Sequence, residues 1–174
     1  MRWESFAAGY QSLWESEKDN AELDERRELV RAVRASTPFF AVLCERVTNE
    51  QVVALIYRLE SPIHISQVGA SWVQGRVCGT AREVLIPLEA VRGLITSRQC
   101  ECGLATPRIF RHVTFGAKLR SIERAGTRIA VSHSVGGVRG RIVAVWQDAI
   151  DVLCTSGVTT IRFGAVHSVS LEGS

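Results

Sequence analysis

The sequence predicts a mainly β protein with an α-helical N-terminus, in which two tandem small five-stranded antiparallel barrels are each preceded by a short helix. Three observations predict this fold class. Glycine is rare in the first third, where only Gly9 precedes Gly69, and frequent beyond it. Apolar residues recur at helical spacing near the N-terminus, whereas later they alternate with polar residues in short runs. These later runs also repeat after about 75 residues.

Length and composition bound the domain organisation. The 174 residues, 46% hydrophobic and 22% charged, suffice for one ordinary domain or two small ones with a real core. We expect an N-terminal helical segment (1–36), a first barrel unit (37–95), a linker (96–113) and a second barrel unit (114–174). No apolar run approaches the roughly 18 residues of a membrane span, and five cysteines at irregular spacing favour reduced thiols. We therefore expect a soluble, cytoplasmic protein with no membrane span.

The N-terminal segment carries an apolar stripe. Residues at spacings of three and four line one face of a predicted helix: Trp3, Phe6, Tyr10, Leu13 and Trp14. A second helix is predicted over 20–35, where acidic residues lead and arginines trail, as the helix dipole favours. We favour packing of the stripe on the protein's own body or in a dimer. The alternative is an arm that binds a partner subunit or a membrane surface, and the five residues are our candidate partner-binding residues.

The repeat is the most informative feature of the sequence. Residues 84–94 align with residues 159–169 at an offset of 75, so that Ile86 meets Ile161 and Leu94 meets Val169. Residues 63–73 align with residues 140–150 at an offset of 77, and small loop insertions explain the drift. Each copy begins with a predicted helix, for which Thr37 and Thr114 are the N-cap candidates.

Five short strands follow the helix in each copy. In the second unit they are predicted over 127–133, 138–146, 149–154, 158–163 and 165–171, with glycine-rich or polar turns between them. Gly126 suits the end of the preceding helix. Closely spaced short strands predict a strongly bent sheet in each half that closes on itself and leaves few bare edges.

This pattern resembles the Sm and Sm-like (LSm, Hfq) small barrels. The first Sm signature is approached by Val138, Gly140, Ile142 and Val145, followed by Ile150, Asp151 and Leu153. The second signature is approached by Ile161, Arg162, Phe163, Val166 and Val169, with Phe163 in place of its glycine. In the first unit the second signature is matched less well, by Ile86, Pro87, Leu88, Val91 and Leu94. Similar alternation occurs in other small barrels, including SH3-like ones.

The resemblance implies an RNA-binding groove formed by the loops that contain Asp151 and Arg162, where Sm proteins stack and hydrogen-bond a base. Asp151 replaces the asparagine of the family, and a carboxylate repels phosphate. Phe163 also lacks the bare backbone that glycine offers. An alternative interpretation of Arg162 is an outward-facing charge on a barrel strand, which we favour.

Basic charge gathers in the second half. Residues 1–60 carry 8 Lys and Arg against 11 Asp and Glu, whereas residues 61–174 carry 13 against 7. Such a field attracts nucleic acid, although a solvated surface has the same composition. Our candidate nucleic-acid-binding residues are Arg111, Lys118, Arg120, Arg124, Arg128, Arg139, Arg141, Asp151 and Arg162.

The sequence contains little that indicates a catalytic site or a metal site. Cys100, Cys102 and His112 offer three zinc ligands, but a structural site needs four and the usual spacing is Cys-x2-Cys. Cys78 and Cys154 occupy similar strand positions, which favours buried small hydrophobic residues. No motif organises a nucleophile and a base, and the Gly136–Gly137 pair is explained by a hairpin turn. We expect no catalytic residues, no metal, no cofactor and no small-molecule substrate.

Two functions remain. The first is a noncatalytic binding and assembly protein whose Sm-like barrels associate edge to edge, either with further copies as a homo-oligomer or with a protein partner. The alternative is binding of RNA or single-stranded DNA through the basic second barrel. Binding to nucleic acid weakens steeply with salt, whereas assembly does not depend on salt in this way.

Overall fold

The computed structural model describes residues 25–49, 52–56, 61–96 and 107–172, and the chain divides into two compact units, Met1–Phe39 and Phe40–Ser174. In the first unit a helix covers residues 25–36, which overlaps the helix predicted over 20–35. The five residues of the N-terminal stripe, Trp3 to Trp14, lie outside the described residues. None of the described helices combines the length and apolar character that crossing a bilayer requires.

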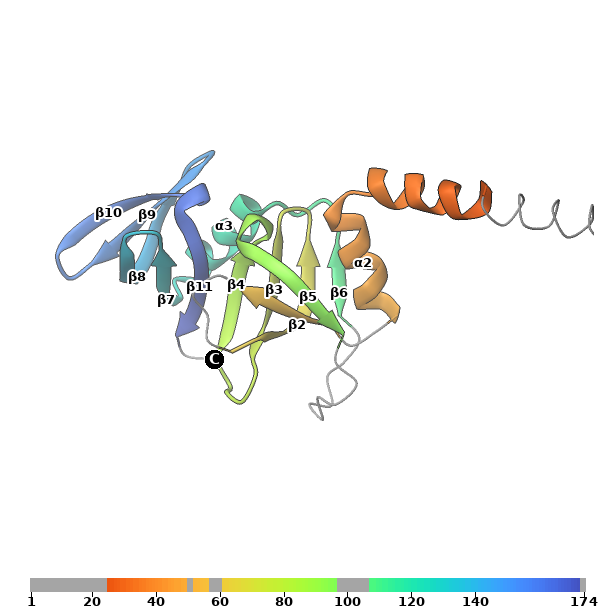
Figure 1. Cartoon of the computed structure of the whole chain (residues 1–174). Coiled ribbons are helices and arrows are strands. Elements are labelled where there is room, and N and C mark those ends of the chain that lie inside the picture. The colour runs from red at the N-terminus through yellow and green to blue at the C-terminus, as the bar shows by residue number, and fades with distance from the viewer. Residues whose placement is uncertain (1–24, 50–51, 57–60, 97–106, 173–174) are drawn as a thin grey trace, which may run out of the picture. The chain divides into compact units, whose positions relative to one another are not determined.

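The second unit is mainly β, as predicted, and the same succession of elements occurs in it twice (Figure 1). The first half contains α2 (Phe39–Asn49), β1 (Val52–Ile56), β2 (Ile63–Gly69), β3 (Trp72–Val77), β4 (Glu83–Pro87), the 3-10 helix η1 (Leu88–Ala90) and β5 (Val91–Thr96). The second half contains α3 (Phe115–Ala125), β7 (Arg128–His133), β8 (Gly136–Val145), β9 (Ala149–Cys154), β10 (Gly157–Arg162), η2 (Phe163–Ala165) and β11 (Val166–Glu172). Between the halves, β6 (Arg108–Phe110) lies within the predicted linker and pairs in parallel with β2.

The ends of α3 follow from its capping residues. The Thr114 side chain accepts a hydrogen bond from the Ala117 amide, and Gly126 ends the helix in the left-handed conformation with a φ of 63°. Both predictions are confirmed. The equivalent prediction for Thr37 is wrong, because its hydroxyl instead donates to the Val33 carbonyl at 2.7 Å, and α2 begins at Phe39.

Strand pairing repeats in detail. In each half the fifth strand pairs with the first, and the first four pair in sequence, so that both halves have the order fifth, first, second, third, fourth. A β-bulge interrupts the pairing of the second and third strands at Ser66 and again at Val143, 77 residues later. Another interrupts the fifth strand at Arg92 and again at His167, 75 residues later. Since bulges bend a strand, both halves curl at the same places.

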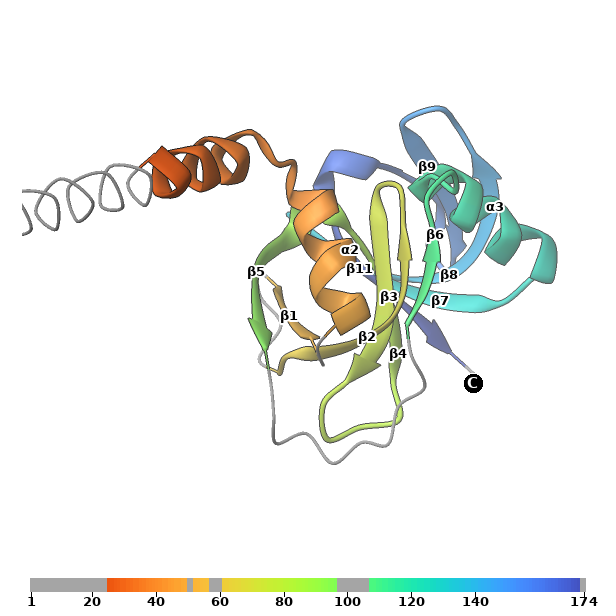
Figure 2. The same cartoon turned by 90° about the vertical axis from the view of Figure 1, so that its right-hand side faces the viewer.

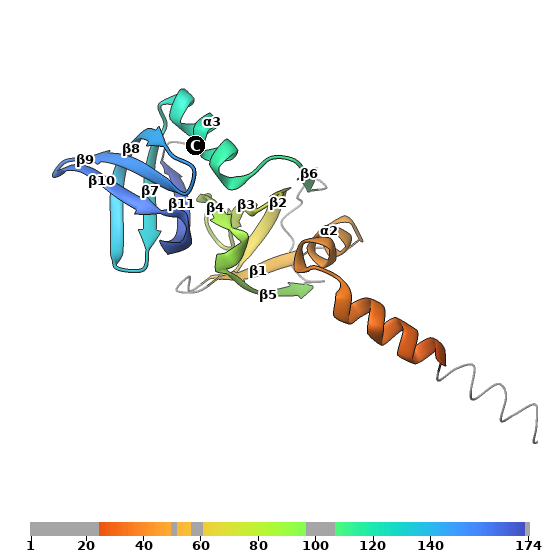
Figure 3. The ribbon, with the colours of Figure 1, turned by 90° about the horizontal axis from the view of Figure 1, so that it is seen from above.

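The halves do not form two separate barrels. The eleven strands form one sheet that is not closed, in the order β10-β9-β8-β7-β11-β4-β3-β2-β1-β5, with β6 beside β2. The predicted closure of each half on itself is therefore not confirmed, because β4 pairs with β11 across the junction, Leu85 opposite Val169 and Val84 opposite Ser170. Viewed from above, the two curled halves lie side by side with β11 and β4 where they meet (Figure 3).

Two apolar cores lie on opposite sides of this junction. The first contains Val84 and Ile86 of β4, and α2 covers it with Leu43 and Val47 (Figure 2). The second contains Leu85 together with Trp72, although both belong to the first half, and α3 covers it with Phe115, Leu119 and Ile122. Because successive side chains of a strand point to opposite faces, β4 supplies both cores. This explains its continuously buried apolar run.

Candidate functional site

The start of α3 is bonded to the first half. The Ser71 hydroxyl accepts a hydrogen bond from the Phe115 amide at 2.9 Å, and the Trp72 indole donates to the Val113 carbonyl at 2.8 Å. The Ala70 amide donates to the same carbonyl. These bonds join the β2–β3 turn to the helix that covers the second core. They hold the two halves in one arrangement.

Lys118 is part of this contact. Its Nζ lies 5.0 Å from the centre of the Trp72 ring and donates to the Gln67 side chain at 3.2 Å. Burial lowers the pKa of Lys118, and the charge of nearby Glu83 opposes that shift. Lys118 was predicted to contact phosphate, and the structure gives it these partners within the protein.

Three of the predicted arginines gather on one face of the second half. In the β7–β8 pairing Arg128 lies opposite Arg141 and Ala130 lies opposite Arg139, so all three arginines share a face. This is the face opposite the second core, to which the alternate residues Ile129 and Val131 belong. All three arginines are exposed. We call this surface the basic face.

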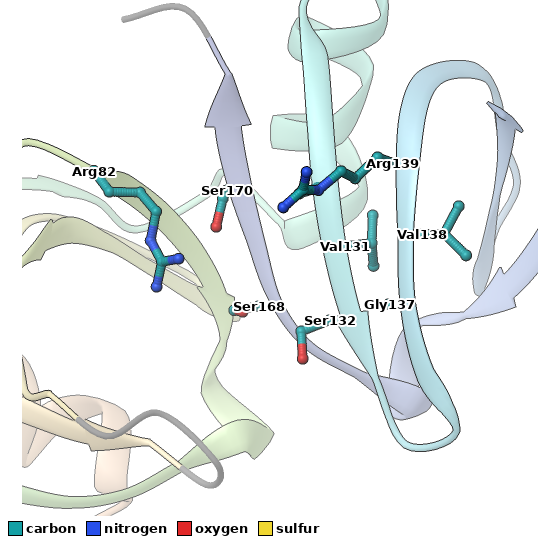
Figure 4. A pocket seen from close by; sticks show the side chains of 9 residues that line it. Arg82, Val131, Ser132, Gly137, Val138, Arg139, Ser168 and Ser170 are labelled. Carbon is teal, nitrogen blue, oxygen red and sulfur yellow. The ribbon is translucent and has the colours of Figure 1, made fainter. Parts of the chain in front are cut away.

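A pocket of about 390 Å³ adjoins the basic face at the junction of the halves (Figure 4). Arg82, which precedes β4, and Arg139 of β8 extend toward each other from either side of β11. The remaining lining residues come from β7, β8 and β11: Ala130, Val131, Ser132, Gly137, Val138, Ser168 and Ser170. Arg82 and the three serines were not among the predicted site residues. Only the pairing of β4 with β11 brings Arg82 near Arg139, and local sequence carries no sign of it.

Asp151 and Arg162 belong to another cluster, at the opposite end of β8, β9 and β10. The two carboxylate oxygens of Asp151 accept hydrogen bonds from the Trp146 indole at 2.9 Å and from the Thr160 hydroxyl at 2.6 Å. Arg162 lies 3.4 Å from the carboxylate of Asp148. Trp146, absent from the predicted set, is 56% exposed. Its position inside the first Sm-like signature, between Val145 and Ile150, was the available signal.

The other predicted basic residues lie elsewhere. Arg120 and Arg124 are exposed on α3 at positions i and i+4, and Arg111 is exposed in the turn after β6. The nine candidates are therefore distributed over α3, the basic face, the Asp151 cluster and the β6 turn. The structure brings together only Arg128, Arg139 and Arg141 on the basic face and Asp151 near Arg162.

The described sheet ends in two edge strands, each with one side unpaired. Among the described residues β10 pairs only with β9, and β5 pairs only with β1. Both ends carry exposed apolar side chains. Val158 of β10 is 59% exposed, its neighbour Leu153 of β9 is 49% exposed, and Ile95 of β5 is 48% exposed. Exposed edges with apolar side chains are templates for pairing with another chain.

The cysteines give no metal site in the described part of the chain. No group of three or more His, Cys, Asp or Glu side chains there is placed to hold a metal ion. Cys100 and Cys102 lie outside the described residues, and His112 is exposed. The prediction that Cys78 and Cys154 are buried is wrong, because both are only partly buried at the ends of their strands.

No protein-family model matches the chain, and no curated protein matches it in sequence.

Proposed function

We propose that the chain is a noncatalytic assembly protein, built from two Sm-like units, that associates with further copies of itself through its end strands. One observation carries the proposal. Within the chain, the fourth strand of the first half, β4, pairs with the fifth strand of the second half, β11. Among the described residues, the strands with an unpaired outer edge are β10, the fourth strand of the second half, and β5, the fifth strand of the first half. The two free edges are therefore the same kinds of strand as the pair that already joins the halves.

The internal junction predicts the register between chains. The repeat offset of 75 relates Leu85 to Thr160 and Leu94 to Val169. Since Leu85 lies opposite Val169, the proposal sets Thr160 opposite Leu94 of the next copy. By the same relation Thr159 lies opposite Ile95 of that copy. The pairing is antiparallel, as at the internal junction.

Such a contact joins two different surfaces. An interface of this kind repeats from copy to copy, so it forms a closed ring when the rotation between copies closes and an open filament when it does not. Pairing supplies backbone hydrogen bonds to both edges and covers Val158 and Ile95, which are now exposed.

The test combines light scattering with an edge substitution. The unmodified protein is expected to have a mass that is a multiple of 19.2 kDa. The double variant Val158→Lys, Thr160→Lys adds charge to the β10 edge and is expected to reduce the mass to that of one chain. The control is Val135→Lys, in the exposed β7–β8 turn away from both edges, which leaves the mass unchanged. A monomeric unmodified protein, or an edge variant with unchanged mass, contradicts the proposal.

A direct test of register uses the variant Thr159→Cys, Ile95→Cys. Residues opposite each other in an antiparallel pair lie within reach of a disulfide. Oxidation is expected to link successive chains into a ladder on a non-reducing gel. The control pair Thr155→Cys, Ile95→Cys places the first cysteine in the β9–β10 turn, and it is expected to give no ladder.

The alternative function, RNA binding, is favoured by the gathering of Arg128, Arg139 and Arg141 on the basic face. Affinity for mixed single-stranded RNA is then expected to fall with salt, with a slope of about 0.7 per phosphate neutralised. Replacing the three arginines by glutamine is expected to flatten the slope, whereas Arg76→Gln on β3 leaves it unchanged. No retention of RNA at low salt by an assembled protein excludes this alternative.

A further inference from the structure

We propose that the pocket between Arg82 and Arg139 binds a small phosphorylated molecule. The pocket lies at the junction of the halves, where Arg82 arrives from the loop before β4 and Arg139 from β8 (Figure 4). Neither the resemblance to Sm-like proteins nor the proposed assembly requires this site. The proposal therefore stands independently of the proposed function.

The charge of the pocket is the first argument. Both ionisable residues that line it are arginines, and the lining contains no carboxylate. The guanidinium of Arg82 has no hydrogen bond or ion pair with any described residue. The neighbouring acid, Glu83, is directed to the other face of β4, where it accepts a hydrogen bond from Gln74 at 3.2 Å. Arg82 is therefore available to an anionic ligand.

Arg139 has one acidic neighbour. Its Nε lies 3.7 Å from the carboxylate of Glu172, and the side chains of Arg139 and Glu172 are 83% and 40% exposed. An exposed pair at this distance contributes little to stability and leaves the terminal guanidinium nitrogens free to donate. Two planar guanidinium groups that line one pocket and extend toward each other from either side of β11 suit the oxygens of a phosphate, because each can donate more than one hydrogen bond.

Hydroxyl groups line the pocket between the two arginines. Ser132 of β7 lies opposite Ser168 of β11, and Ser170 lies opposite Ala130, so the three hydroxyl-bearing residues share one face. Ser168 is only 3% exposed, which is unusual for serine. A serine hydroxyl donates a hydrogen bond as readily as it accepts one. These residues add neutral donors to the two positive charges without adding a competing negative charge.

Size selects a small ligand over a polymer. A volume of about 390 Å³ is within the roughly 300–1,000 Å³ of small-molecule pockets. This volume is large enough for a phosphate group and a sugar esterified to it. A nucleic-acid strand would instead contact the basic face along Arg128 and Arg141, outside the residues that line the pocket.

Titration calorimetry on the full chain tests the proposal, with inorganic phosphate and adenosine monophosphate as the probes and adenosine as the ligand control. Saturable binding of both phosphates is expected, with no binding of adenosine. Arg82→Gln and Arg139→Gln are each expected to weaken binding by about tenfold or more, the usual effect of losing a charged hydrogen bond. The protein control is Arg124→Gln on α3, which removes the same charge away from the pocket and leaves the affinity unchanged.

Two results overturn the proposal. They are absence of phosphate binding at millimolar concentration and an equal loss of affinity in the Arg124→Gln variant. Light scattering on the same samples reports assembly separately. A protein that assembles without binding phosphate contradicts only this inference, and a monomer that binds phosphate contradicts only the assembly.

Discussion

Leu85 and Thr160 occupy the same position in the fourth strands of the two halves, 75 residues apart. Leu85 is completely buried because β11 pairs with β4 and the second core encloses its side chain. Thr160 is exposed and donates its hydroxyl to Asp151. The same repeat position is thus an apolar residue in β4, which pairs with β11, and a polar residue in β10, which lies at the edge of the sheet.

The first prediction concerns that buried position. Leu85→Ala is expected to reduce the free energy of unfolding by about 2–5 kcal/mol, because it leaves a cavity between β4 and the second core. Urea denaturation measures the change. Leu153→Ala, in a side chain half exposed on β9, is the control, with a change of about 0.5 kcal/mol or less. Similar losses in the two variants would contradict the buried junction.

A close backbone approach underlies the second prediction. A Cβ added at Gly140 would overlap the backbone carbonyl of Leu153 on the paired strand, and the backbone there cannot yield without breaking the β8–β9 pairing. Gly140→Ala is therefore expected to lower the free energy of unfolding by about 3 kcal/mol, the upper end of the usual cost of overpacking. Gly164→Ala, where no atom lies within 4 Å of the added Cβ, serves as the control and is expected to unfold at nearly the unchanged temperature.

Helix capping provides the third. Thr114→Ala removes the acceptor for the Ala117 amide and is expected to lower the free energy of unfolding by about 1 kcal/mol. Thr114→Ser keeps the oxygen and is expected to restore most of that loss. Thermal unfolding followed by circular dichroism separates the two, and equal melting temperatures for the alanine and serine variants would contradict the capping role.

The fourth prediction compares two thiols. Hydrogen bonds from Ser156 and then Thr159 lower the pKa of Cys154, whereas burial raises the pKa of Cys44 against a smaller effect of Arg111. Because the thiolate is the reactive form, Cys154 is expected to react with iodoacetamide faster than Cys44 near neutral pH. Mass spectrometry of the alkylated peptides measures both rates.

Ser156→Ala tests the cause. Removing the hydroxyl 3.2 Å from the Cys154 sulfur raises its thiol pKa, so the pH dependence of alkylation is expected to move to higher pH. The Cys44 profile, far from the substitution in sequence, is the internal control. An unmoved Cys154 profile shows that these hydrogen bonds do not set its reactivity.

Local sequence signals predicted much of the second half. Thr114 and Gly126 identify the ends of α3, and alternation with turn residues located β7 to β11 to within a few residues. These signals act over a few neighbouring residues, as capping and side-chain alternation do. The repeat allowed the same prediction, one helix followed by five strands, to be made for the first half.

The pairing of strands that are far apart in the sequence was not predicted. Val84, Leu85 and Ile86 form a continuously buried run, which is typical of a strand covered on both faces, but nothing local indicates that β11 is the neighbouring strand. For the same reason the pocket was missed, since Arg82 and Arg139 lie in different halves of the repeat and only long-range strand pairing brings them together. The RNA-binding role expected of Asp151 depends on side-chain partners that a sequence does not reveal, Trp146 and Thr160.

Because β4 contributes side chains to both cores, each half needs the other in order to fold. If the first half melts, the second loses Leu85 and Trp72 from its interior, and if the second melts, β4 exposes Leu85 and β3 exposes Trp72 to water. The duplicated segment has therefore ceased to be separable: severing the chain between the copies should yield two fragments that aggregate alone and regain structure only when mixed.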